Sequence, residues 1–214
     1  DFTNEGIKFS HGKFVTIDGV KVWAQRLSYV GEIGFELYTN IDESKKLFLA
    51  IIKEGKNHGL SLCGAHAMDI MRMESGFLHW GHDISPEENQ YQAGLNFAIS
   101  YKKNINFVGK EALLKIKDQN PTKSLAMMVL KDNRPGEPLL LHEEPIYLDD
   151  KIIGRTTSGN YSFNFKKNIS FGYVNSGNSI EDLINKNLSI EVEKKKYPVT
   201  IIKKPLNQKN IKNI

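Results

Sequence analysis

The sequence predicts an α+β protein in which a region of mixed helices and strands is followed by a small antiparallel β-barrel. Apolar residues recur at helical spacing twice before Gly76. From about Pro121 the pattern changes to short strand-like runs, which turn residues such as Asp149–Asp150 and 175–177 separate. We therefore expect one domain over residues 1–120, a barrel domain over residues 121–206 and a tail over residues 207–214.

The first region begins with a predicted β-hairpin. Residues 20–29 alternate loosely, turn through Val30–Gly34 and continue as a strand over residues 35–39. A helix follows, with Asp42 as a possible cap and Gly59 at its exit. A second helix is expected over "HAMDIMRMES", residues 66–75, and Gly76 should end it.

The segment from Gly76 to Gly94 shows no period and contains glycine, proline and acidic residues, which indicates a long loop. Residues 95–101, "LNFAISY", alternate again and are expected to form a strand, and residues 109–118 a short helix. The predicted barrel strands are "SLAMMVL", "PIYLD", "KIIGRTTS", "ISFGYV", "LSIEVE" and "YPVTIIK".

Composition excludes several classes of protein. The mean hydropathy is -0.40, and no apolar run reaches the roughly 20 residues that a membrane helix needs. A single cysteine, Cys63, excludes a disulfide framework and a multi-thiolate zinc site. The net charge of +4 comes from scattered lysines without interleaved aromatic residues, so nucleic-acid binding is not favoured. With no signal-peptide pattern, we expect a cytoplasmic protein, or one of the mitochondrial matrix if eukaryotic.

The histidines do not predict a metal centre. The six side chains are scattered along the sequence, and only His79, His82 and Asp83 lie close together, in "HWGHD". No pair has metal-ligand spacing with a carboxylate on a clear helix. A loop braced by hydrogen bonds is therefore the preferred interpretation, and no metal is expected.

Glu36, in the stretch "RLSYVGEIGFELYTN", is a carboxylate next to apolar and aromatic residues, and its position calls for an explanation. Strand parity predicts that Glu36 and Tyr38 share one face if Phe35 and Leu37 face the core. One interpretation is a surface ion pair with Lys21 or Arg26. The other is a receptor for a flat heterocycle with two adjacent N–H donors, such as a pterin, against which Tyr29 could pack.

Four segments resemble the glycine-cleavage T-protein (aminomethyltransferase) superfamily. "SYVGEIGFELY" is similar to its [ST]-Y-x-G-E-x-G-x-E-[LI] motif, and "CGAHAMDIMRMESGFLHWGHDIS" to its helix and loop. "GLNFAISYKKNINFVGKEAL" and "GRTTSGNYSFNFKKNISFGYV" resemble the elements that follow, in family order. The local sequence around "FLHWGHD" and "HEEPIYLDD" most resembles the folate-handling C-terminal region of dimethylglycine and sarcosine dehydrogenases.

The resemblance implies tetrahydrofolate as the cofactor and a pterin site that includes three residues of this chain. Glu36 matches the glutamate that binds the pterin edge, Tyr29 matches the motif tyrosine, and Phe77 would help to line the pocket. The T-protein pattern has an arginine for the folate tail where this chain has Met68. This departure favours the dehydrogenase-like subgroup, whose flavin (FAD) lies in a separate domain.

The implied function is the tetrahydrofolate-binding part of a one-carbon transferase. It would act on N-methyl amines such as dimethylglycine or sarcosine, or on the aminomethyl group of the glycine cleavage system. The resemblance also leads us to expect a partial folate-binding aminomethyltransferase domain. Its missing N-terminal segment would supply the catalytic aspartate, so no catalytic residue is expected here. Expected partners are folate, an amine or aminomethyl donor, that segment or a flavin domain, and a second copy through self-association.

One alternative remains open, a folate-fold accessory protein in tRNA modification or iron–sulfur maintenance. The iron–sulfur relatives carry K-G-C-Y-x-G-Q-E, whereas Cys63 stands in "SLCGAHAM". An ordinary aminomethyltransferase or a sulfonium demethylase on the same fold is a further possibility, because the residues named above do not separate the donors.

Overall fold

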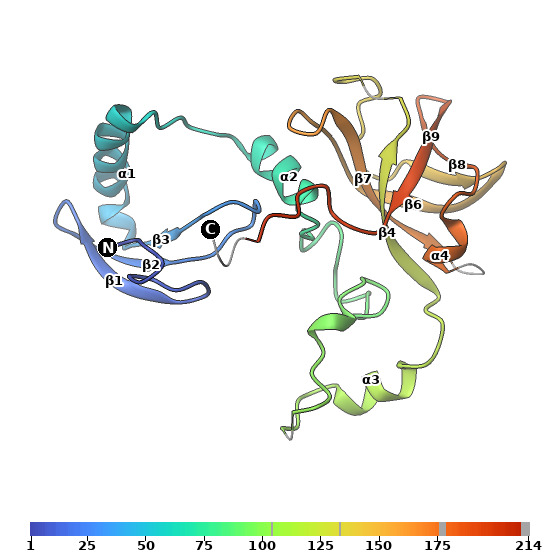
Figure 1. The fold of residues 1–214 in the computed structure, drawn as a ribbon, viewed down its shortest axis with the longest axis horizontal. Helices are drawn as coiled ribbons and strands as arrows, with labels where there is room; N and C mark the ends of the chain where they lie inside the picture. The colour runs from blue at the N-terminus through green and yellow to red at the C-terminus, as the bar shows by residue number, and fades with distance from the viewer. Residues whose placement is uncertain (104, 133, 176–178, 211–214) are drawn as a thin grey trace. The chain divides into compact units, whose positions relative to one another are not determined.

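A computed structural model describes residues 1–103, 105–132, 134–175 and 179–210 (Figure 1). Its contacts divide the chain into two compact units. The first contains Asp1–Ser75 together with the residues from Asn207 onward, and the second contains Gly76–Leu206. The domain limits expected from sequence, residues 1–120 and 121–206, stay a prediction.

The first unit is built on a three-stranded antiparallel sheet with the order β1-β2-β3. Its strands are β1 (Gly12–Ile17), β2 (Val20–Gln25) and β3 (Glu36–Tyr38). β1 and β2 form a hairpin through Asp18 and Gly19, whose φ angles of 48° and 74° suit the mirror-image turn that joins twisted strands. This hairpin was missed from sequence, although Asp-Gly between alternating apolar residues is its usual signal.

The hairpin expected over residues 20–29 and 35–39 exists in shortened form. β2 pairs with β3 in the register Gln25↔Glu36, so residues 26–35 are a connection outside the strands. Helix α1 (Ile41–Gly55) packs on one face of the sheet (Figure 1). The core between them consists of Val20, Val22 and Leu47, with Val15, Ile17, Leu37 and Ile51 packed around it.

The helices of this unit agree with the sequence pattern apart from the first cap. Asn40 occupies the N-cap of α1, and Asp42 lies in the first turn, where its charge favours the positive end of the helix. A 3₁₀ turn, η1 (Lys56–His58), leads to Gly59, whose φ of 73° ends the helical segment as expected. Helix α2 (Ala65–Glu74) follows and ends just before Gly76.

The second unit begins with a long loop, and the strand expected over residues 95–101 is wrong. A 3₁₀ turn, η2 (Asn96–Ala98), stands there instead. The amides of Ala98 and Ile99 bond to carbonyls three residues earlier, so the backbone is satisfied without a partner strand. Phe97, which the alternation placed on one strand face with Leu95, Ile99 and Tyr101, is 82% exposed. The short helix α3 (Lys110–Ile116) was predicted correctly.

The predicted barrel is present as a closed antiparallel sheet with the order β4-β7-β6-β5-β8-β9 (Figure 1). Its elements are β4 (Lys123–Leu130), β5 (Pro145–Leu148), β6 (Lys151–Ser162), β7 (Lys167–Asn175), α4 (Ile180–Leu183), β8 (Leu188–Val192) and β9 (Lys195–Ile202). Alternate residues fill the interior, as the pleat requires: Ala126, Met128, Leu130, Leu188, Ile190, Val199 and Ile201 are all buried. The turn expected at residues 175–177 lies outside the described residues, except for Asn175.

Candidate functional site

Glu36 lies on the exposed face of the first sheet. It is the first residue of β3, and Leu37 on the opposite face packs against the core. Tyr38, two residues on, shares the exposed face, and its hydroxyl donates a hydrogen bond to Glu36 Oε2. Strand parity therefore placed this carboxylate correctly. The hydrogen bond to Glu36, with smaller contributions from burial and from the carboxylate charge, raises the pKa of Tyr38.

Neither cation proposed for a surface ion pair binds Glu36. The Lys21 Nζ lies over the Phe14 ring, 4.5 Å from its centroid. The Arg26 side chain points into the unit, is 3% exposed and donates to the Ile7 carbonyl at 3.2 Å. Within the described ranges, the Tyr38 hydroxyl is the one protein group that hydrogen-bonds to the Glu36 side chain. The Glu36 residue is exposed to solvent.

Long-range hydrogen bonds hold the connection over residues 26–35, which leads into Glu36. Ser75 Oγ donates to the Val30 carbonyl at 3.2 Å, and the Asn207 side-chain amide donates to the Gly31 carbonyl at 3.2 Å and to Ser75 Oγ at 3.1 Å. The backbone N–H of Asn207 bonds to the Glu74 carbonyl at 2.8 Å. Asn207, which the sequence assigned to a tail, therefore helps to hold the 26–35 connection in place.

The glycine at position 31 is required by this packing. Gly31 is buried, its φ is 72°, and a Cβ there would overlap the Ser75 hydroxyl and the Asn207 amide. Gly34 is also crowded, because a Cβ would lie 2.7 Å from the Leu27 carbonyl oxygen. Glu32, the first glutamate of the motif, pairs with Lys209 at 2.6 Å on the surface.

Tyr29 and Phe77 lie in different units. Tyr29 is half-buried within the 26–35 connection, on the other side of the Gly31–Gly34 turn from Glu36. Phe77 is half-buried at the start of the second unit, immediately after Gly76. Met68, which stands where the family pattern has an arginine, is exposed on α2. The structure thus places Tyr29 within the connection that leads into Glu36.

Buried Asp83 anchors the loop that follows Phe77 to the barrel. Its side chain is 0% exposed, and its carboxylate accepts hydrogen bonds from the Thr157 hydroxyl at 2.5 Å, the Ser158 hydroxyl at 2.8 Å and the His79 backbone N–H at 2.9 Å. The Tyr173 hydroxyl donates to the Asp83 carbonyl at 2.9 Å. Asp83 is thus a bracing residue, as the hydrogen-bonded interpretation of "HWGHD" expected.

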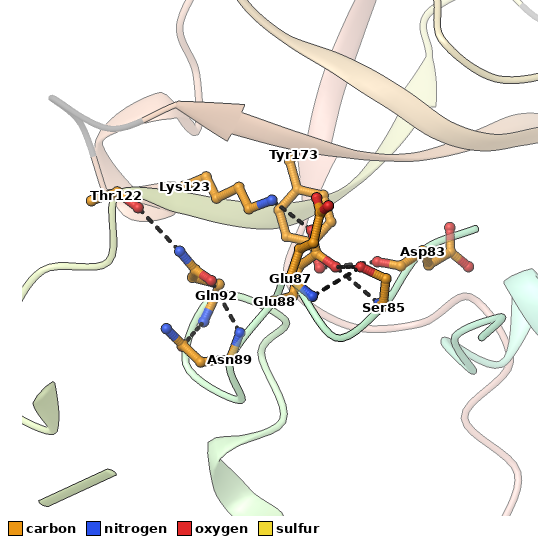
Figure 2. Close-up of polar contacts among 9 residues, drawn as sticks. All are labelled: Asp83, Ser85, Glu87, Glu88, Asn89, Gln92, Thr122, Lys123 and Tyr173. Carbon is orange, nitrogen blue, oxygen red and sulfur yellow. Dashed lines mark hydrogen bonds and ion pairs between the residues drawn. The ribbon is translucent and has the colours of Figure 1, made fainter. Parts of the chain in front are cut away.

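Glu88 is a second anchor of this loop (Figure 2).

 Lys123 Nζ, at the start of β4, lies 2.5 Å from Glu88 Oε1, and the backbone and side chain of Ser85 donate to Glu88 Oε2 at 2.9 and 2.7 Å. Burial alone would raise the pKa of Glu88, but the hydrogen bonds from Lys123 and Ser85 outweigh it and lower this pKa.

Tyr173 lies beside this ion pair (Figure 2). The Lys123 ammonium is 4.8 Å from the centroid of its ring. Burial, followed by the charges of Glu88 and Asp83, raises the pKa of Tyr173, so its hydroxyl stays protonated and remains a donor to the loop. The Gln92 side-chain amide also donates a hydrogen bond to the Thr122 hydroxyl at 3.0 Å. The segment that begins at Phe77 is therefore fixed to the barrel at several points.

The histidines of the loop stack on one another. The rings of His79 and His82 are 4.3 Å apart and 23° from parallel, and His142 lies edge-on to His82 at 6.4 Å. Among the residues that the structure describes, no group of three or more His, Cys, Asp or Glu side chains could hold a metal ion. None of the helices in the described ranges has the length and apolar character needed to cross a membrane.

Two family profiles match this chain. The GCVT N-terminal domain matches residues 1–103, and the glycine cleavage T-protein C-terminal barrel domain matches residues 123–207. A mixed α/β region joined to a closed six-strand antiparallel barrel is the architecture that these matches imply. The chain belongs to the glycine cleavage T-protein family, and the resemblance inferred from its motifs is confirmed.

Individual relatives and one solved structure agree with this membership. The chain is 33% identical over 207 residues to the mitochondrial dimethylglycine dehydrogenase of Mus musculus, covering 96% of this chain and 23% of that protein. It is 36% identical over 167 residues to an aminomethyltransferase of Symbiobacterium thermophilum, covering 78% of this chain and 44% of that protein. It therefore spans about a quarter to a half of these relatives.

The crystal structure of aminomethyltransferase T of the glycine cleavage system from Bartonella henselae has the same fold. It superposes with a TM-score of 0.80, covering 96% of this chain and 55% of that chain. The sequence identity is 21%, so this likeness concerns the fold. It includes the barrel that the short strands after Pro121 predicted.

Proposed function

We propose that this chain is the tetrahydrofolate-binding part of a one-carbon transfer enzyme. The observation that carries the proposal is the position of Glu36, an exposed carboxylate directly after the 26–35 connection that is not engaged by Lys21 or Arg26. Membership of the glycine cleavage T-protein family supports the same cofactor. The site would bind the pterin through Glu36, Tyr29 and Phe77.

The chemistry of Glu36 fits the pterin edge. An ionised carboxylate offers about four lone-pair sites, and Tyr38 occupies one of them. The adjacent N–H groups at the 2-amino-4-oxo edge of a pterin form a donor pair that two carboxylate oxygens accept together. Charge assistance makes such paired bonds stronger than neutral ones. The ordered 26–35 connection presets the position of the carboxylate before the ligand arrives.

The contribution of these residues is binding and orientation. When bound, tetrahydrofolate supplies the nitrogen nucleophiles that accept a one-carbon unit. Glu36 would fix one edge of the ring, and Tyr29 would pack against its face. Phe77 stays a third pterin contact that the resemblance predicts. A ring held at one edge and one face presents its reacting nitrogen in a restricted set of directions, which lowers the entropic part of the barrier.

The donor follows from the relatives and is the finer part of the proposal. Similarity to dimethylglycine dehydrogenase and the presence of Met68 in place of an arginine favour an N-methyl amine such as dimethylglycine or sarcosine. The aminomethyl group of the glycine cleavage system is the second donor, because an aminomethyltransferase is also among the relatives.

Titration of the intact protein with two ligands tests the proposal. The first is a reduced folate, and the second is the matched reduced pteridine without the 2-amino group. We expect the second ligand to bind roughly 10- to 100-fold more weakly, because one of the two bonds to Glu36 is lost. Equal affinity for the two ligands, or no binding of the reduced folate, would contradict the proposed function.

A further inference from the structure

We infer that Tyr38 is a positioning residue that orients the Glu36 carboxylate for the ligand. The inference rests on the function proposed above and adds a residue that the motif comparison did not single out. Its basis is the hydrogen bond from the Tyr38 hydroxyl to Glu36 Oε2, between two side chains on the same exposed face of β3.

The bond matters because Glu36 is otherwise unrestrained. An exposed glutamate samples many rotamers, and each one that turns away from the ligand lowers the apparent affinity. Tyr38 selects the rotamers in which Oε2 lies toward its hydroxyl. The bond uses one lone pair of Oε2, so both oxygens still accept from a donor pair.

The Tyr38 side chain starts from a fixed position on the sheet. It stands directly opposite Trp23 on β2, a cross-strand neighbour at a distance at which side chains pack. The Trp23 ring lies over Gly12, where a Cβ would come within 2.6 Å of the indole, and it meets Phe14 edge-on at 5.1 Å. Phe14, Trp23 and Tyr38 therefore stand in one row across the three strands, with Tyr38 at its end on β3.

The register places a neutral side chain opposite the carboxylate. Gln25 pairs with Glu36, so no charge from the neighbouring strand competes with Tyr38 at that position. Lys21, the cation on the same face of β2, is engaged with the Phe14 ring. The carboxylate thus keeps its charge available for a ligand while one neutral donor sets its orientation.

A double-mutant cycle in the intact protein tests the inference. Tyr38→Phe keeps the ring and removes the donor, and we expect it to weaken binding of a reduced folate about two- to tenfold. In the Glu36→Ala background the same substitution should cause no further loss, because the side chain that Tyr38 positions is absent. Tyr161→Phe, on a barrel tyrosine that packs edge-on against Phe163, is the matched control and should bind as the unchanged protein does.

A ligand-free readout accompanies the cycle. Because the Glu36 carboxylate raises the pKa of Tyr38, Glu36→Gln should lower that pKa, which NMR of labelled tyrosine rings can follow. The inference is overturned if Tyr38→Phe binds folate with unchanged affinity, or if its effect persists undiminished beside Glu36→Ala. If the unchanged protein does not bind reduced folate, the proposed function fails and the inference fails with it.

Discussion

The Asp83 carboxylate and the Ser158 hydroxyl lie 2.8 Å apart, although 75 residues separate them in the sequence. This bond joins the loop after Phe77 to strand β6. Together with the bonds from Thr157 and the His79 backbone, it satisfies a carboxylate that has no access to water. The loop that carries a candidate pterin contact is therefore built on the barrel.

Asp83→Asn should destabilise the second unit by about 2–3 kcal/mol, since the amide replaces an acceptor with a donor that faces other donors. The measurement is denaturant unfolding of the variant against the unchanged protein. Asp150→Asn is the matched control, because Asp150 is fully exposed in its pair with Lys196 and should leave the unfolding midpoint unchanged. Equal midpoints for all three proteins would show that the buried carboxylate does not brace the loop.

The ion pair between Glu88 in the loop and Lys123 in the barrel should weaken at acidic pH. The pKa of Glu88 is lower in the folded protein than its ordinary value of 4.5, so its contribution to stability is present above that value and is lost as the pH falls through the folded pKa. Glu88→Gln should make the free energy of unfolding less dependent on pH below about pH 5. Parallel pH profiles for the two proteins would mean that the pair is not formed.

Gly31→Ala should destabilise the first unit more than an ordinary substitution at positive φ. Both Gly31 and Gly59 have φ near 72°, with values of 72° and 73°, but a Cβ at Gly59 meets nothing within 4 Å. Gly59→Ala should therefore cost only the backbone strain, about 1–2 kcal/mol. Gly31→Ala adds a clash with Ser75 and Asn207, so its unfolding midpoint should fall further, and its folate affinity should fall too. Equal midpoints would argue against the packing described around this turn.

The barrel could be predicted from sequence because runs of strand-forming residues follow one another after Pro121 and turn residues separate them. The strand expected at residues 95–101 fails for a physical reason. Alternation at Leu95, Phe97, Ile99 and Tyr101 resembles a strand, but local bonds within the η2 turn satisfy the backbone, and Phe97 stays exposed. Periodicity alone cannot tell whether a partner strand is present.

The candidate site shows the same limit. The exposed side of Glu36 followed from strand parity with Leu37. The role of Asn207 could not be predicted from the sequence. Its hydrogen bonds to Gly31 and Ser75 join residues that are more than a hundred positions apart, and no local pattern signals them. The hydrogen bonds from Thr157 and Ser158 in the barrel to Asp83 could not be predicted from the sequence for the same reason.

The two glutamates of the motif loop provide the most direct test of the central claim, that Glu36 binds the pterin edge. Glu36→Gln and Glu32→Gln make the same chemical change four residues apart, and Glu32 lies in a surface pair with Lys209. In titrations with a reduced folate, we predict that Glu36→Gln weakens binding roughly 10- to 100-fold and that Glu32→Gln changes it less than about twofold. Unchanged affinity in the Glu36→Gln protein would contradict the account.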